Sequence, residues 1–210
     1  MKQKWQERPA CPFPGFFFSD AKNSRCIMQL IKQIRIRLHD SLLKKISSSY
    51  QGARRSVSLE KAEFIGILFD GTEPEERETV LNFAKHLKEQ DKKVKLLAFF
   101  DNNLKSQHFA FHYFNRRHLD FALRPQSQDA IEFAEQPFDL LLNLSSKSIL
   151  PLDFIAAHSK AKFRVGPYTD KLFCYDLMIE PSGKKDLNAF LEEVIFYLTK
   201  MQPNYEAAIV

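Results

Sequence analysis

Short apolar runs alternate with amphipathic stretches from Phe64 to the end of the sequence. Phe138–Leu144 is the clearest run, because it is almost unbroken in apolar residues, as is typical of a strand covered on both faces in a parallel sheet. Residue spacing, prolines and capping residues predict the helices between the runs. The predicted strands are Phe64–Phe69, Val94–Phe100, Phe138–Leu144, Phe163–Val165 and Tyr175–Ile179. The predicted helices are one that starts at Thr72 or Glu73 and ends at Gln90, followed by Ser127–Gln136, Pro151–Lys160 and Asp186–Met201.

This alternation of strand and helix predicts an α/β fold. Right-handed crossovers between the strands give a mostly parallel sheet with helices on both faces. We expect a single three-layer Rossmann-like sandwich over residues 59–202, followed by a tail at residues 203–210. Before Arg124 the pattern is weak, and the partial alternation of Phe109, Phe111 and Tyr113 indicates an extended or edge segment.

A basic amphipathic helix is predicted before this domain, over residues 27–50. It either covers the sheet of the domain itself or binds a partner through its basic side chains. Residues 1–26 are rich in proline and charge without a sustained period, so we expect a disordered leader or an artefact of the choice of start site. The apolar helix positions are Ile27, Leu30, Ile31, Ile34, Leu38 and Leu42, and the candidate partner-binding residues are Lys32, Arg35, Arg37, Lys44 and Lys45.

The charge is distributed unevenly along the chain. The whole sequence has a formal net charge of +5. Residues 1–58 contain 12 Lys/Arg and 3 Asp/Glu, which is +9, whereas residues 59–210 contain 19 and 23, which is −4. Because basic segments favour nucleic acids and anionic membranes, any such contact is expected from the N-terminal segment alone.

The cysteines and the N-terminal residues indicate the compartment. Cys11, Cys26 and Cys174 form no CxxC pair, which argues against a disulfide framework and against a cysteine zinc site. The apolar cluster Phe16–Phe18 is interrupted by prolines and followed by Asp20, so it is too short for the core of a signal peptide or for a transmembrane segment. We therefore expect a cytoplasmic protein.

Polar residues follow several predicted strands, at the edge where ligands bind in folds of this class. Such residues are also common as turn and helix-capping residues, and the sequence leaves both interpretations open. The candidate ligand-binding residues are Asp70, Thr72, Asp101, Asn143, Ser145, Ser146 and Lys147.

Known catalytic and cofactor-binding motifs are missing from these loops. ILFDGTE resembles the first motif of haloacid-dehalogenase phosphatases, but Leu68 stands where their nucleophilic aspartate is required. The sequence contains no GxGxxG and no GxxxxGK[ST], so no backbone cradle for a dinucleotide or a triphosphate is predicted. Alternating aromatics around His108, His112 and His118 favour an extended aromatic segment over a metal-binding helix. We predict no catalytic residue, no metal site and no cofactor.

Several segments together resemble a domain family of unknown function that is associated with Bacteroidota. They are the basic helix, IGILFD, FDLLLNL, PLDFIAAHSKAKFRVG, YDLMIE and FLEEVIFYL. The resemblance covers Met28–Met201 and is most specific over Phe138–Gly166. It implies a Rossmann-like fold, and the family has no established activity that could be assigned to this chain. A second resemblance, at the level of the fold, is to the N-terminal half of heptosyltransferase-type glycosyltransferases, and it rests on Phe138–Leu140 and Ala161–Gly166. The domain that holds most of the nucleotide sugar in those enzymes has no counterpart in this sequence.

Two hypotheses for the function follow. The first is a non-catalytic cytosolic interaction module whose basic N-terminal helix binds a protein or an anionic partner such as RNA, with an affinity that falls as salt rises. The second is a binding protein or enzyme for a small molecule, such as a nucleotide or phospho-sugar, that uses the strand-end loops. The first is favoured because the sequence contains no catalytic motif.

Overall fold

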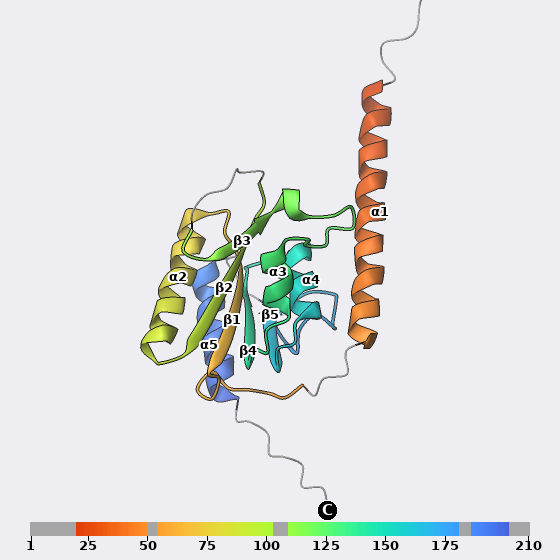
Figure 1. Ribbon diagram of the computed structural model, residues 1–210. Coiled ribbons are helices and arrows are strands. Elements are labelled where there is room, and N and C mark those ends of the chain that lie inside the picture. Colours follow the sequence, from red (N-terminus) through yellow and green to blue (C-terminus); the bar gives the residue numbers. More distant parts are fainter. Residues whose placement is uncertain (1–19, 50–53, 103–108, 181–185, 202–210) are drawn as a thin grey trace, which may run out of the picture. The chain divides into compact units, whose positions relative to one another are not determined.

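The computed structural model describes residues 20–49, 54–102, 109–180 and 186–201 (Figure 1). Within the first range, side chains are described from Ile27 to Ile46. The elements are α1 (Asp20–Ser49), β1 (Phe64–Asp70), α2 (Pro74–Glu89), β2 (Lys93–Phe100), β3 (His112–Asn115), η1 (Arg116–His118), α3 (Gln128–Ala134), β4 (Leu140–Leu144), α4 (Leu150–His158), β5 (Phe163–Pro167), β6 (Leu177–Ile179) and α5 (Leu187–Lys200).

The strands of the described residues form a six-stranded sheet in the order β3-β2-β1-β4-β5-β6. Every pairing in it is parallel. The chain runs outward from β1 to β3, crosses to β4 and runs outward again to β6, so the strand order reverses between β1 and β4. Helices α2 and α5 cover one face, and α3 and α4 cover the other (Figure 1). The predicted Rossmann-like three-layer sandwich is confirmed.

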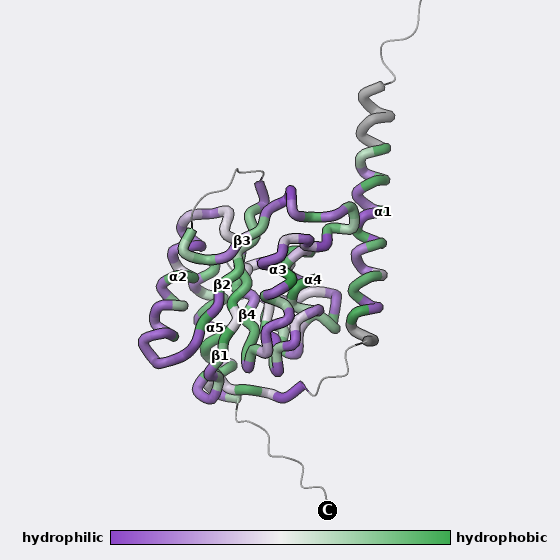
Figure 2. Tube along the Cα trace, viewed as in Figure 1, coloured by the Kyte–Doolittle hydropathy of each residue, from purple (hydrophilic) through white to green (hydrophobic). Residues whose placement is uncertain are grey.

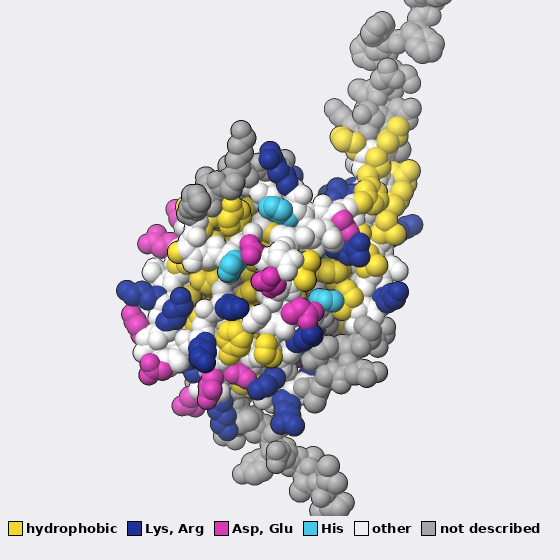
Figure 3. All heavy atoms as spheres, viewed as in Figure 1, with side chains coloured by type: hydrophobic (Ala, Val, Ile, Leu, Met, Phe, Trp, Pro, Cys, Tyr) yellow, Lys and Arg dark blue, Asp and Glu magenta, His cyan; other side chains and the backbone are white. Residues whose placement is uncertain are grey.

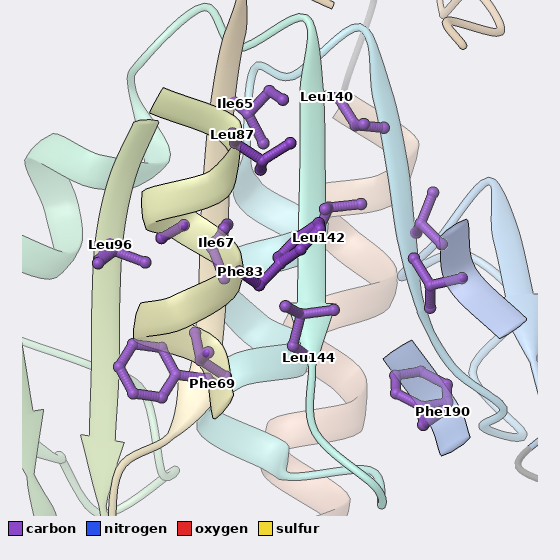
Figure 4. Close-up of a cluster of buried hydrophobic side chains, with 14 of the residues drawn as sticks. Ile65, Ile67, Phe69, Phe83, Leu87, Leu96, Leu140, Leu142, Leu144 and Phe190 are labelled. Atoms are coloured by element: carbon purple, nitrogen blue, oxygen red, sulfur yellow. The ribbon is translucent and has the colours of Figure 1, made fainter. Parts of the chain in front are cut away.

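Alternate side chains of the central strands enter two hydrophobic cores. In β1, Ile65, Ile67 and Phe69 face α2 and α5, whereas Leu68 faces α3 and α4. Figure 4 shows the first core, in which Phe83 of α2 lies beside the strand residues. Burial on both faces explains why the central strands are continuously hydrophobic, as Figure 2 shows along the chain trace.

Helix α1 takes part in the second core from Arg35 onward. The contacts divide the chain into residues 1–34 and residues 35–210, and α1 continues through this division. Leu43 is fully buried in the core on the side of α3 and α4, and His39 is fully buried as well. This part of α1 therefore covers the domain itself, which is one of the two roles that the sequence left open.

The observed elements differ from the predicted ones mainly at their ends. The backbone of α1 begins at Asp20 rather than at Ile27, because no proline or glycine interrupts the helical residues before Ile27. Residues 1–19 of the expected leader lie outside the described residues. The weak pattern around Tyr113 contains the edge strand β3, which pairs with β2, and the short helix η1, which was not predicted.

Candidate functional site

The ends of β1 and β4 meet where the strand order reverses, and ligands of open parallel sheets bind at this point. Asp70 is the last residue of β1, and Ser146 and Lys147 follow β4. The Nζ atom of Lys147 lies 4.0 Å from Oδ2 of Asp70, while Ser146 is half-buried. Two of the predicted ligand-binding residues thus face each other across the reversal.

Thr72 connects this edge to the end of β2. Its backbone N–H donates to Oδ1 of Asp70 at 3.0 Å, and its hydroxyl oxygen accepts from the backbone N–H of Asp101 at 2.9 Å. Asp70, Thr72, Asp101 and Lys147 therefore form one group. The hydrogen bonds of Thr72 are of the kind that closes turns.

Asp101 is paired with an arginine that the sequence did not single out. The guanidinium of Arg116 donates from Nε to Oδ1 at 2.5 Å and from Nη2 to Oδ2 at 2.9 Å. The hydrogen bonds from Arg116 lower the pKa of the Asp101 carboxyl, and those to Asp101 raise the pKa of Arg116. Both carboxylate oxygens of Asp101 are thus engaged by the protein itself.

Glu76, in the first turn of α2, makes this edge acidic. Burial raises its pKa, and the charge of Asp70 raises it further, while Lys147 opposes the shift. The charges of Glu73 and Asp186 also raise the pKa of Glu76. An acidic edge is unfavourable for the phosphates of a nucleotide or a phospho-sugar. Sequence reasoning missed this role, because carboxylates at the start of a helix are readily explained by the helix dipole.

Gly71 lies where a cofactor phosphate approaches the backbone in dinucleotide-binding folds. In this structure the ring of Phe100 fills that space, since a Cβ atom on Gly71 would lie 2.9 Å from Cζ of the ring. Arg77 lies over the same ring, with its guanidinium carbon 5.7 Å from the centroid, and its Nη1 donates to the carbonyl oxygen of Gly71 at 2.7 Å. The glycine therefore accommodates an aromatic side chain at this turn.

Asn143 and Ser145 are directed into the domain, and both are almost completely buried. The amide of Asn143 donates to the hydroxyl of Tyr175 at 2.6 Å and accepts from the hydroxyl of Ser145 at 2.8 Å. Tyr175 in turn donates to Oδ1 of Asp153 at 2.6 Å, and burial raises the pKa of that carboxyl. These two predicted site residues belong to a buried hydrogen-bond network away from the group around Asp70.

The basic residues of α1 fall into two kinds. Arg35 is half-buried; its Nε donates to the carbonyl oxygen of Phe121 at 2.8 Å, and its guanidinium carbon lies 5.7 Å from the centroid of the Phe121 ring. Arg35 therefore binds the domain itself. The other four predicted residues have exposed side chains and are Lys32, Arg37, Lys44 and Lys45.

One face of α1 is attached to the domain by a buried histidine and an ion pair. The imidazole Nδ1 of His39 lies 2.8 Å from the carbonyl oxygen of Ala122, and burial lowers the pKa of this histidine. Asp40 pairs with Lys171 at 2.8 Å. Because Asp40 is the sole acidic residue between Ile27 and Ile46, this helix surface is otherwise basic or uncharged.

A row of exposed apolar side chains runs along α1, and we refer to it as the apolar stripe. Figure 3 shows hydrophobic side chains gathered along this helix with basic side chains near them. Each member of the stripe is between 42% and 56% exposed. The stripe consists of Ile27, Leu30, Ile31, Ile34 and Leu38.

The remaining histidines near β3 are engaged separately. Nδ1 of His112 lies 3.0 Å from Oδ1 of Asp129, and Nδ1 of His118 accepts from the backbone N–H of Asn115 at 3.1 Å. His108 lies outside the described residues. Within the part of the chain that the structure describes, no three His, Cys, Asp or Glu side chains are arranged to hold a metal ion. No described helix combines the length and apolar character needed to cross a membrane.

Comparisons with known proteins give a family but no activity. The chain matches neither a curated protein nor a solved structure. The likeness to heptosyltransferases and the association with Bacteroidota stay predictions. A family model described as "Family of unknown function (DUF6913)" matches residues 35–201, which begins in the middle of α1 and ends just after α5. Because this match covers most of the sequence, the chain belongs to the DUF6913 family of unknown function.

Proposed function

We propose that the protein is a non-catalytic interaction module that binds an anionic partner through α1. The observation that carries this proposal is the two-sided character of the helix. One face is attached to the domain through His39 and Leu43, whereas the apolar stripe and the side chains of Arg37 and Lys44 are exposed. The one acidic residue of this surface, Asp40, is paired with Lys171. The charge of the exposed face thus favours a negatively charged partner.

The alternative function, binding or conversion of a nucleotide or phospho-sugar at the strand-end loops, has less support. The carboxylates of Asp70 and Glu76 oppose phosphate binding, and Arg116 already occupies Asp101. Phe100 fills the space at Gly71 where a phosphate would approach. The residues that the structure does bring together are therefore explained by turns and internal pairs.

We also propose a cytoplasmic location for the module. The support is the cysteine pattern of the sequence together with the state of Cys174. Its side chain is buried, and burial raises the pKa of the thiol to about 12, so the thiol stays protonated and unreactive. A buried protonated thiol is compatible with a reducing compartment.

Charge reversal on α1 tests the proposed function. Binding is measured by fluorescence or by sedimentation with three anionic probes: single-stranded RNA, heparin and vesicles that contain phosphatidylserine. The full chain should bind at least one of them, with an affinity that falls as salt rises and that is lost in the triple variant K32E/R37E/K44E. The matched control K85E/K88E/K93E carries the same change in net charge on α2 and β2, where all three lysines are exposed, and should bind like the wild type.

Point variants are preferable to removal of the whole helix. His39 and Leu43 are buried, so a chain that starts at Glu60 would lose part of its own core. Binding that survives the triple variant, or that the control variant abolishes equally, would contradict a site on α1. Absence of binding to all three probes would contradict an anionic partner.

A further inference from the structure

We propose that the partner of α1 is the surface of an anionic lipid bilayer, in which the apolar stripe inserts between the headgroups. This inference rests on the proposed function, because it names the class of anionic partner that α1 binds. A bilayer can contact both the apolar stripe and the basic side chains of α1, whereas a phosphate backbone would contact the basic side chains alone. The geometry of the helix, the identity of its flanking residues and a neighbouring aromatic residue support it.

The stripe has the shape of an interfacial helix surface. At 3.6 residues per turn its five side chains fall within an arc of roughly 100°, and they extend over roughly 17 Å of helix axis. His39 and Leu43, which attach the helix to the domain, project roughly 130° and 170° away from the centre of this arc. The stripe therefore lies on a different face of α1 from His39 and Leu43, and burial of exposed Ile27 and Leu30 in an apolar layer is favourable.

Basic side chains lie beside the stripe. Arg37 and Lys44 project roughly 70° and 90° to one side of its centre, whereas Arg35, on the other side, donates to the carbonyl oxygen of Phe121. The long side chains of Arg37 and Lys44 can reach anionic headgroups while the apolar residues beside them enter the acyl boundary. The charge of the flanks is thus complementary to a membrane that contains phosphatidylserine or another acidic lipid.

An exposed aromatic residue of the domain contacts Arg35 of α1. Phe121 lies on the turn between Leu119 and Pro125, where it is 58% exposed and contacts Arg35 on the flank of the stripe. Phenylalanine is among the residues that enter the boundary between the headgroups and the acyl chains.

Self-association and RNA fit these residues less well. Ser41 and Lys45 interrupt the stripe after Leu38, so it lacks the three or four heptads of a coiled coil. Pairing of two copies through the stripe would also place the basic side chains beside it, Arg37 and Lys44, at an interface between two positively charged helices. Residues 27–46 contain no Phe, Tyr or Trp on which RNA bases could stack, and the ring of His39 is buried. The apolar stripe would stay exposed on a phosphate backbone.

Vesicle sedimentation with the full chain tests the inference. The protein should bind vesicles of phosphatidylcholine mixed with phosphatidylserine, and should bind pure phosphatidylcholine vesicles and single-stranded RNA at least about tenfold more weakly. Substitution of the stripe without a change of charge, in I31Q/I34Q, should weaken binding by about tenfold or more, because both side chains lose their contact with the apolar layer. R37Q/K44Q should weaken it roughly fivefold per residue.

The controls separate insertion from general effects of the substitutions. L81Q/I131Q replaces two aliphatic residues of similar exposure on α2 and α3, and K85Q/K88Q neutralises two exposed lysines on α2. Both should bind vesicles like the wild type, and all variants should keep the far-UV circular dichroism spectrum of the wild type.

Three results would overturn the membrane assignment. Vesicle binding that I31Q/I34Q leaves unchanged would show attraction by charge without insertion. Binding of RNA or heparin but not of vesicles, reduced by R37Q/K44Q, would overturn the bilayer and leave the proposed function intact. Concentration-dependent self-association that I31Q/I34Q abolishes, with no binding to vesicles, RNA or heparin, would overturn both the bilayer and the anionic partner.

Discussion

Replacement of His39 should loosen the attachment of α1 and remove an acid-sensitive contribution to stability. The imidazole is fully buried, its Nδ1 lies 2.8 Å from the carbonyl oxygen of Ala122, and its ring centroid is 5.6 Å from that of Phe154. His39→Ala leaves the carbonyl without this donor and opens a cavity, so we expect a loss of about 3–5 kcal/mol in the free energy of unfolding. His39→Asn keeps a side-chain N–H near Nδ1 and should lose only about 1–3 kcal/mol.

The pH dependence gives the sharper test. Burial lowers the pKa of His39 below 6.5, and Lys171 adds to this shift, while the hydrogen bond with Ala122 and the charge of Asp40 oppose it. In the unfolded chain the imidazole titrates near its ordinary value of about 6.5. Between these two pKa values the unfolded state binds more protons than the folded state, so acid favours unfolding. The contribution of His39 to the free energy of unfolding is therefore fully present above about pH 6.5 and is lost as the pH falls, by up to about 1.4 kcal/mol per pH unit.

Urea unfolding of the wild type and of His39→Asn, followed by circular dichroism from about pH 7 down to about pH 5, measures this contribution. Effects of the other titratable groups cancel in the difference between the two proteins. The stability advantage of the wild type should shrink as the pH falls from neutral to acidic. An advantage that is independent of pH, or that grows in acid, would refute the buried neutral histidine.

Three further substitutions test the buried contacts by the same unfolding measurement. Burial raises the pKa of Asp153, so the folded state holds this proton more tightly than the unfolded state. The stability advantage of the wild type over Asp153→Asn should therefore fall as the pH rises above about 3.8, and an advantage that rises with pH would contradict this. Gly166→Ala should destabilise by about 1–3 kcal/mol, because its Cβ would lie 2.4 Å from Cε1 of Tyr175, and an unchanged midpoint would exclude the clash. The carboxylate of Asp139 accepts from the backbone N–H of Phe64 at 2.9 Å. Burial raises the pKa of this carboxyl, but the hydrogen bonds from Lys162 and from the backbone lower it by more, so its pKa in the folded protein is below the ordinary value. The stability that Asp139→Asn removes should therefore be present above about pH 3.8 and decline below it.

Most of the fold could be predicted because its signals are local. The continuous apolar runs of the central strands follow directly from burial on both faces, and their positions are confirmed within a few residues. Helix α3 is confirmed in the same way, although Ser127, the first residue of the predicted helix, is its N-cap, since its hydroxyl accepts from the backbone N–H of Ala130. The short edge strand β3 was harder to recognise because it has one neighbour and only four residues.

The roles of the candidate site residues depended on partners far away in the sequence. Alternation alone places Asn143 on the same face of β4 as Leu141, but its partner Tyr175 is 32 residues away. Arg35 looked like the other basic residues of α1, yet Phe121, 86 residues later, accepts its hydrogen bond. Such pairings follow from the tertiary fold, so spacing in the sequence could not separate exposed from internally bound residues.

The continuity of α1 across Ile34 and Arg35 has a consequence for how this family can vary. The match to the family model begins at Arg35, so residues 27–34 lie before the shared domain although they continue the same helix. Residues 27–34 contribute no side chain to the two hydrophobic cores, so helical turns can be added or removed before Arg35 without changing a core contact of the domain. The membrane affinity that we propose for α1 can therefore be adjusted in evolution, or by design, through the number of apolar turns alone, while the core of the domain stays unchanged.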